Sequence, residues 1–183
     1  MSANLDDNPQ ARPADQGERR RTRLREFQSQ LVERMQAARA GGQAHASQLG
    51  IQIGAQRWLV SLQQAGEIVP VPVITPVPLT QDWFLGVANI RGNLVTVVDL
   101  ASFHGHAGTP LDKDCRILAF SPSLSFNAGL LASRVLGLRN MAQMQAAGEE
   151  GSSMLYVDAE GQSWQQLDLA ALTRDPRFLH IGI

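Results

Sequence analysis

Asp99, His104 and His106 are the residues of this sequence whose types and spacing come closest to a reactive or metal-binding group. Two imidazoles and a carboxylate are ligands that Zn²⁺ accepts in proteins. A metal site needs a further firm ligand, and the glycine-rich stretch around the two histidines supplies none. We therefore interpret this stretch as a plain surface loop and expect no metal.

Cys115 is the single cysteine, so no internal disulfide can form, which fits a reducing compartment. As a nucleophile it would need a base such as His180, but no pattern supports that pairing. It lies in the apolar run Cys-Arg-Ile-Leu-Ala-Phe, which is typical of a strand, so we expect a buried thiol. The sequence also contains no phosphate loop, dinucleotide fingerprint or Gly-x-Ser-x-Gly motif. We predict a protein that is not an enzyme and that binds no cofactor.

Composition argues against several other classes of function. The 183 residues suffice for one domain with a core, plus an extension. A net charge of -1 gives no overall attraction to nucleic acid, and aromatic residues at 5% are too few for base-stacking platforms. No apolar stretch approaches the roughly 20 residues that span a bilayer, and no secretory signal is recognisable. We expect a cytoplasmic protein with no nucleic-acid partner and no membrane insertion.

The N-terminal quarter of the sequence differs from the rest. Residues 1–20 are polar with almost no large apolar groups, which predicts a disordered tail. In residues 21–42, apolar residues recur every three or four positions before a Gly-Gly pair, which predicts an amphipathic helix. This helix either packs on its own domain or docks on another protein. Five arginines near its start form either a solvated face or a patch for nucleic acid or lipid headgroups.

Residues 45–178 consist of short runs typical of β-strands, separated by turn residues. Many short strands without alternating long helices favour barrels or a sandwich over an α/β fold. Pro70 and Pro72 mark the run 67–74 as an edge strand, because both delete donors on the same side. Asp168 is expected to cap a short closing helix over 168–173. The other predicted strands are 48–53, 57–62, two arms within 85–100, 116–120, 129–133, 135–138 continuing the same sheet, 154–157 and 164–167.

The run from residue 86 to residue 103 carries the functional prediction. It indicates a strand, a tight turn at Gly92-Asn93, a second strand and a helical turn that Asp99 can cap. Asn89 can bond the backbone of the tight turn. A long charged side chain such as Arg91 is not needed to form the turn, so it is available to a partner.

The same run resembles the signature of CheW-like domains, the coupling proteins of bacterial chemosensory arrays. In that family a Gly-Val-x-Asn-Leu-Arg-Gly stretch leads to Pro-Val-x-Asp-Leu and a later Phe. Ile90 here replaces the usual leucine and Thr96 the usual proline, and the resemblance extends more loosely over residues 47–175. The matching residues are Gly86, Val87, Asn89, Arg91, Gly92, Val97, Asp99, Leu100 and Phe103.

The resemblance implies an all-β fold of two small five-stranded SH3-like barrels packed side by side, here with the N-terminal helix and a short C-terminal helix. It implies a non-catalytic scaffold at membrane-associated receptor arrays. Its partners would be the cytoplasmic tip of a methyl-accepting chemoreceptor and the regulatory domain of a CheA-type histidine kinase. Carried over by position, the receptor-binding residues would be Asn89, Arg91, Gly92 and, more weakly, Glu67. Apolar groups at Ala65 and Val87 would line the groove between the barrels.

The spelling Ala-Asn-Ile-Arg-Gly-Asn and the N-terminal helix resemble the adaptors of type IV pilus (twitching motility) chemosensory systems. A flagellar chemotaxis coupling protein is an alternative within the same family. A nucleic-acid- or ligand-binding β-barrel module is an alternative from a different class. A large, salt-sensitive thermal shift with DNA or RNA would favour that last alternative.

Overall fold

The structure of the protein is a computed structural model that describes residues 47–151 and 153–183. Every described residue belongs to one compact unit of the chain. The predicted tail of residues 1–20 and the predicted helix of residues 21–42 lie outside the described residues. Within the described ranges, no helix is long and apolar enough to cross a membrane.

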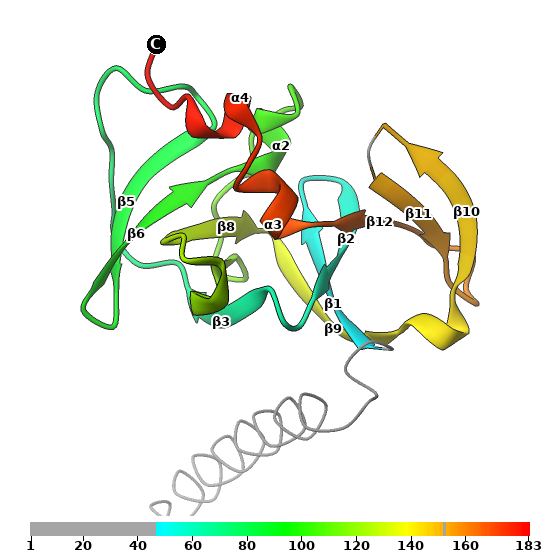
Figure 1. The fold of residues 1–183 in the computed structure, drawn as a ribbon. Helices are drawn as coiled ribbons and strands as arrows, with labels where there is room; N and C mark the ends of the chain where they lie inside the picture. The colour runs from blue at the N-terminus through cyan, green and yellow to red at the C-terminus, as the bar shows by residue number, and fades with distance from the viewer. Residues whose placement is uncertain (1–46, 152) are drawn as a thin grey trace, which may run out of the picture. The chain divides into compact units, whose positions relative to one another are not determined.

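The strands of the described region form two six-stranded sheets (Figure 1). The strand order of the first sheet is β10-β11-β12-β2-β1-β9, and only the β12–β2 pair is parallel. Its strands are β1 (Ser47–Ile53), β2 (Gln56–Ser61), β9 (Arg134–Asn140), β10 (Gln145–Glu150), β11 (Ser153–Val157) and β12 (Ser163–Leu167).

The strand order of the second sheet is β3-β7-β8-β6-β5-β4, and only the β6–β8 pair is parallel. The predicted all-β architecture of two β units is therefore confirmed, with six strands in each sheet where five were expected. The strands of the second sheet are β3 (Ala65–Pro70), β4 (Ile74–Thr75), β5 (Phe84–Ile90), β6 (Asn93–Val98), β7 (Arg116–Phe120) and β8 (Ala128–Ala132).

Two segments differ from the sequence prediction for local reasons. The run 67–74 is not one strand, because β3 ends at Pro70 and β4 begins only at Ile74, where the chain pairs with β5 instead of β7. The intervening Pro72 has no N–H to donate to a ladder. β10 was not predicted, because Gln-Ala-Ala-Gly-Glu-Glu contains no β-branched or aromatic residue and all six side chains are exposed.

The two sheets are joined by one nearly continuous stretch of chain. β8 and β9 are separated only by Ser133, whose N–H donates to the carbonyl of Gln52 at 2.8 Å. β8 pairs with β6 and β7 in the second sheet, whereas β9 pairs with β1 in the first. The prediction that residues 135–138 continue the same sheet is wrong, because Gly129 to Ala132 are buried in one sheet and the chain then crosses to the other.

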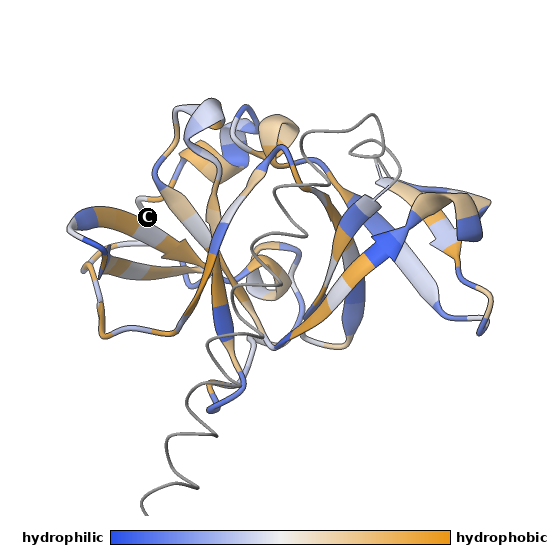
Figure 2. Cartoon of the chain, turned by 90° about the horizontal axis from the view of Figure 1, so that it is seen from below, coloured by the Kyte–Doolittle hydropathy of each residue, from blue (hydrophilic) through white to orange (hydrophobic). Residues whose placement is uncertain are grey.

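Both sheets bury apolar side chains, such as Ile51 and Leu59 in the first sheet and Val97 and Ile117 in the second. Figure 2 shows hydrophobic and hydrophilic segments interspersed in the strands on both sides of the molecule. Alternating burial along β5 and β6 turns one face of the hairpin inward. The core cluster of this sheet consists of Ala88, Ile90, Val95, Val97, Cys115, Ile117 and Leu131.

Three short helices close the fold: α2 (Leu100–Phe103), α3 (Leu169–Leu172) and α4 (Pro176–Leu179). The predicted caps are confirmed, since Asp99 accepts from the N–H of Ala101 and Asp168 from the N–H of Ala171. α4 was not predicted, although Asp175 caps it and a proline occupies its first turn. Two single 3₁₀ turns, η1 (Pro122–Leu124) and η2 (Met141–Gln143), lie in connecting loops.

Candidate partner-binding groove

The tip of the β5–β6 hairpin is a two-residue turn formed by Arg91 and Gly92. Ile90 and Asn93 are the last paired residues, and the φ angles of Arg91 and Gly92 are 51° and 87°. Two successive positive φ angles are the mark of a type I′ turn, whose twist matches that of the strands. The predicted turn at Gly92-Asn93 is therefore wrong by one residue. The side chain of Asn89 explains the shift, because its Oδ1 accepts from the N–H of Gly92 at 2.7 Å and fixes the turn at Arg91.

Arg91 pairs with Glu67 of β3 across the second sheet. Arg91 Nε lies 2.7 Å from Glu67 Oε2, and the side chains are 78% and 37% exposed. An ion pair this exposed contributes about 0–1 kcal/mol, so its main effect is to orient the guanidinium rather than to stabilise the fold. The contact also brings the β5–β6 hairpin tip to β3, the strand at the opposite edge of the same sheet.

A groove of about 930 Å³ lies beside this ion pair. Gly66 allows β3 to approach β7 at the groove, because a Cβ there would lie 2.7 Å from the carbonyl oxygen of Phe120. An apolar floor with a polar rim suits a site that receives another protein's side chains. The apolar lining residues include Ala65, Ile90, Val95, Ala119, Phe120 and Phe126, and the polar ones include Gln63, Glu67, Asn93, Ser121, Ser123 and Asn127.

The structure brings together most of the residues singled out from the sequence. Ala65 and Glu67 line this groove, and Arg91 joins it through its ion pair with Glu67. No strand of the first sheet lines it, so it is not the groove between two barrels that was predicted for Ala65 and Val87. Gly92 and Asn89 form the turn that presents Arg91. Val87 is not among the lining residues: it lies opposite Thr75 of β4 and alternates with the buried Ala88.

The phenylalanines of the groove floor, Phe120 and Phe126, were missed in the sequence. Their ring centroids are 6.2 Å apart, and they flank the loop that contains η1. The sequence shows this loop only as a turn-rich segment. The signal that could have revealed it is a phenylalanine inside an otherwise polar loop, which indicates that the loop folds back onto apolar surface.

Asp99 and His104, two of the three residues considered as metal ligands, make contacts within the fold. Both carboxylate oxygens of Asp99 are used, by the N–H groups of Ala101 and Thr109 and by the hydroxyls of Ser102 and Thr109. His104 stacks on Trp58 at 5.7 Å, and the resulting partial burial, followed by the nearby His106 and Arg177, lowers its pKa. The described residues contain no group of three or more potential metal ligands.

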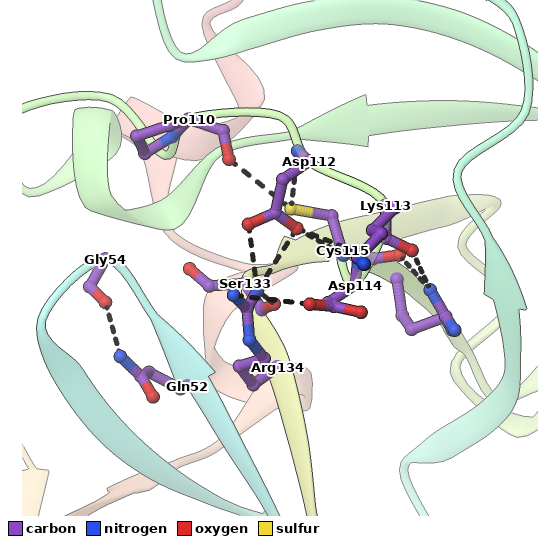
Figure 3. A network of polar contacts seen from close by, with 10 residues as sticks. Gln52, Gly54, Pro110, Asp112, Lys113, Asp114, Cys115, Ser133 and Arg134 are labelled. Carbon is purple, nitrogen blue, oxygen red and sulfur yellow. Dashed lines mark hydrogen bonds and ion pairs between the residues drawn. The ribbon is translucent and has the colours of Figure 1, made fainter.

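A second polar network joins the loop after α2 to the start of β9 (Figure 3). Nη1 of Arg134 lies 3.1 and 3.0 Å from the two carboxylate oxygens of Asp112, and its Nη2 lies 3.6 Å from Asp114. The backbone N–H of Asp114 and then Arg134 lower the pKa of Asp112. Burial raises the pKa of the Cys115 thiol, which donates to the carbonyl of Pro110. Such a thiol is a poor nucleophile, as expected for a structural cysteine.

Comparisons with known proteins agree with the fold. The family model for the CheW-like domain matches residues 48–177. Protein PilI of Pseudomonas aeruginosa is 33% identical over 94 residues, so the match spans about half of either protein: 51% of this chain and 52% of PilI. The structure of the scaffolding protein TtCheW from Thermoanaerobacter tengcongensis superposes with a TM-score of 0.58 at 17% identity. That alignment covers 67% of this chain and 88% of TtCheW, and it supports the fold alone.

Proposed function

The chain belongs to the CheW-like domain family, and from this premise we propose that it is a non-catalytic scaffold of a chemosensory array. In this role it couples a methyl-accepting chemoreceptor to a CheA-type histidine kinase in the cytoplasm, at membrane-associated arrays. The similarity to PilI supports a type IV pilus system that controls twitching motility. The observation that carries the proposal is the groove with Arg91 oriented at its rim by Glu67.

The groove offers the receptor an apolar floor and one directed cation. Glu67 engages only Nε of Arg91 in the described ion pair, and a guanidinium has four further N–H donors. Those donors can meet a carboxylate or a carbonyl of the receptor helices while Glu67 holds the side chain in place. A charge-assisted hydrogen bond of this kind contributes roughly 1.5–3 kcal/mol when it is well desolvated.

Signalling through such a scaffold depends on differences in contact energy. A receptor can alter kinase activity only if its two conformations bind the complex with different free energies. The groove meets this requirement if a shift of the receptor helices changes how deeply they enter it or whether they reach Arg91. No chemical step at the scaffold is needed.

The test is Arg91→Glu, with co-sedimentation of a soluble cytoplasmic fragment of a chemoreceptor from the same genome. We expect about tenfold weaker binding or more, because the variant places like charge beside Glu67 and removes the donors. Lys113→Glu is the matched control, since it makes the same change from positive to negative charge at an exposed position outside the groove and outside α3–α4. If Arg91→Glu binds the fragment as tightly as wild type, the receptor does not bind at this site.

The choice of motility system is tested separately. Deletion of the gene should abolish twitching motility and leave flagellar swimming unaffected. The opposite result would place the protein in a flagellar chemotaxis array.

A further inference from the structure

The C-terminal helices α3 and α4 lie beside strands of the second sheet (Figure 1). Side-chain contacts tie this segment to two walls of the groove. Neither helix supplies a residue to the groove itself. Both helices nevertheless contact residues that are next to, or part of, its lining. The segment therefore contacts the groove walls from outside the groove.

The first tie is the side chain of Gln64, in the turn between β2 and β3. Its Nε2 donates to Oδ1 of Asp168 at 2.9 Å, and its Oε1 accepts from the N–H of Leu169 at 2.8 Å. Its backbone carbonyl accepts from the N–H of Ser121 at 2.8 Å. One residue thus connects the start of α3 to two parts of the groove wall, because Ser121 and the neighbours of Gln64 line the groove.

The second tie is the contact between Phe126 and Phe178. Their ring centroids are 6.1 Å apart. Phe126 also packs on the groove residue Phe120, with ring centroids 6.2 Å apart. Phe178 is 3% exposed and stacks on Trp83 at 5.5 Å with an interplanar angle of 13°. Phe178 therefore joins a groove-lining ring to the interior of the second sheet.

The segment is also anchored away from the groove. The N–H of Gln81 donates to the carbonyl of Ile181 at 2.8 Å, and the N–H of Ile183 donates to the carbonyl of Leu79 at 3.2 Å. The side chain of Gln81 adds a third bond, to the carbonyl of Gly182 at 3.1 Å. These bonds hold the chain end in place, so α4 can serve as a fixed support for Phe126.

We propose that the α3–α4 segment sets the width of the groove, and that Gln64 and Phe178 are its positioning residues. Gln64 acts through the turn that precedes β3, and Phe178 acts through Phe126. The identity of the occupant rests on the proposed receptor function, whereas the support of the groove walls does not. The two claims can therefore fail separately.

The first experiment exchanges an amide and a carboxylate. Gln64→Glu loses the donor to Asp168 and sets two carboxylates against each other, so the turn should move away from α3. Adding Asp168→Asn restores the hydrogen bond in the reverse direction, because the amide of residue 168 can donate to the carboxylate of residue 64. The amide oxygen of residue 168 remains available to cap α3. We expect about tenfold weaker binding of the chemoreceptor fragment in Gln64→Glu and recovery to within about threefold of wild type in the double variant.

The second experiment needs no partner. In Phe178→Leu, the backbone amide ¹H–¹⁵N chemical shifts of residues 121–128 should change, because Phe126 loses its supporting ring. Leu179→Ala is the matched control: it lies on the same helix, is 52% exposed, and should leave those shifts unchanged. Thermal melts of both variants show whether each remains folded at the temperature of the spectra.

Each outcome decides one of the two claims. If the shifts of residues 121–128 stay as in wild type in folded Phe178→Leu, or if Asp168→Asn fails to rescue Gln64→Glu, the α3–α4 segment does not position the groove. If those shifts move and yet neither Gln64→Glu nor Arg91→Glu changes binding of the fragment, the positioning is retained and the receptor assignment is wrong. Should Phe178→Leu not fold, the swap at residues 64 and 168 decides the question, since it creates no cavity.

Discussion

The two sheets of this protein have six strands each and both bury apolar side chains, but they differ in the polar contacts that accompany this packing. The second sheet contains a cluster of seven buried apolar residues. The first sheet buries apolar residues of β1 and β2, and its buried Trp164 has polar partners as well: Asp158 accepts from its Nε1 at 2.9 Å, and the guanidinium of Arg139 lies 4.8 Å from its ring centroid. Apolar packing is non-directional, whereas these contacts depend on geometry.

The difference extends to unsatisfied groups. Gln48 Oε1 and Arg139 Nε are the buried side-chain atoms without a hydrogen-bond partner in the part of the chain that the structure describes, and their residues are cross-strand neighbours in the first sheet. β10, at the edge of this sheet, is exposed along its whole length. We therefore expect the first sheet to respond more strongly than the second to the loss of a polar contact.

The largest effect expected from this comparison is that of Trp164→Ala. Loss of a buried tryptophan costs about 3–5 kcal/mol, and here it also removes the ring under which Gly50 allows close approach, since a Cβ at Gly50 would lie 2.9 Å from that ring. Hydrogen exchange should show lost protection in β1, β2 and β9–β12 and retained protection in the second sheet.

Leu131→Ala is the matched change in the core of the second sheet, with an expected cost of about 2–5 kcal/mol. It should lower protection in both sheets together, because β9 follows directly from β8. If Trp164→Ala also melts the second sheet in a single transition, the two sheets are one cooperative unit and the contrast between them is wrong.

A smaller effect is expected from acid. The N–H of Gln162 and then the indole of Trp164 lower the pKa of Asp158 below its usual value near 4. A carboxylate with a depressed folded-state pKa contributes stability above its unfolded pKa, and that contribution is lost as the pH falls through the folded value. Asp158→Asn should therefore destabilise the protein at pH 7, and the difference from wild type should shrink as the pH falls below about 4.

Urea unfolding followed by tryptophan fluorescence at pH 7 and at pH 3 measures this difference. Glu160→Gln, in the same connection between β11 and β12, is the control, because the described hydrogen bonds of Glu160 involve only its backbone. A constant difference between Asp158→Asn and wild type across this pH range would show that the charge of Asp158 does not support Trp164.

The smallest effect on stability is expected at the groove. Glu67→Gln should change the free energy of unfolding by less than about 1 kcal/mol, because the pair with Arg91 is exposed. It should still weaken binding of the chemoreceptor fragment, since Arg91 loses the carboxylate that orients it. A stability loss well above this value would mean that the ion pair holds the second sheet together and is not primarily a recognition device.

The sequence predicted the local features of this site better than the assembled ones. The sequence predicted a turn from Asn89 and Gly92 and a helix cap from Asp99. The structure contains both, with the turn displaced to Arg91 and Gly92. The pattern predicted that Asn89 bonds the backbone of the turn, but it did not show that the N–H of Gly92 is the donor, and this donor fixes the one-residue register.

The groove could not be predicted, because its walls are far apart in the chain. Ala65 lines it together with Phe126, and the support from Phe178 comes from another 52 residues further on. Gly86 illustrates a third case. Its φ of 132° and the close approach of the Thr75 carbonyl explain why glycine stands there, but the sequence shows only a glycine near a strand.

The crossing at Ser133 has a consequence for the order in which the chain folds during synthesis. All strands of the second sheet lie within residues 65–132, whereas those of the first come from residues 47–61 and 134–167. The second sheet is thus an insertion within the first. As the ribosome adds residues at about 5–20 per second, the inserted sheet is complete while the β1–β2 hairpin still lacks β9 and β12. The second sheet can therefore complete its strand pairing before the first sheet, although the first sheet contains the strands that are synthesised earliest.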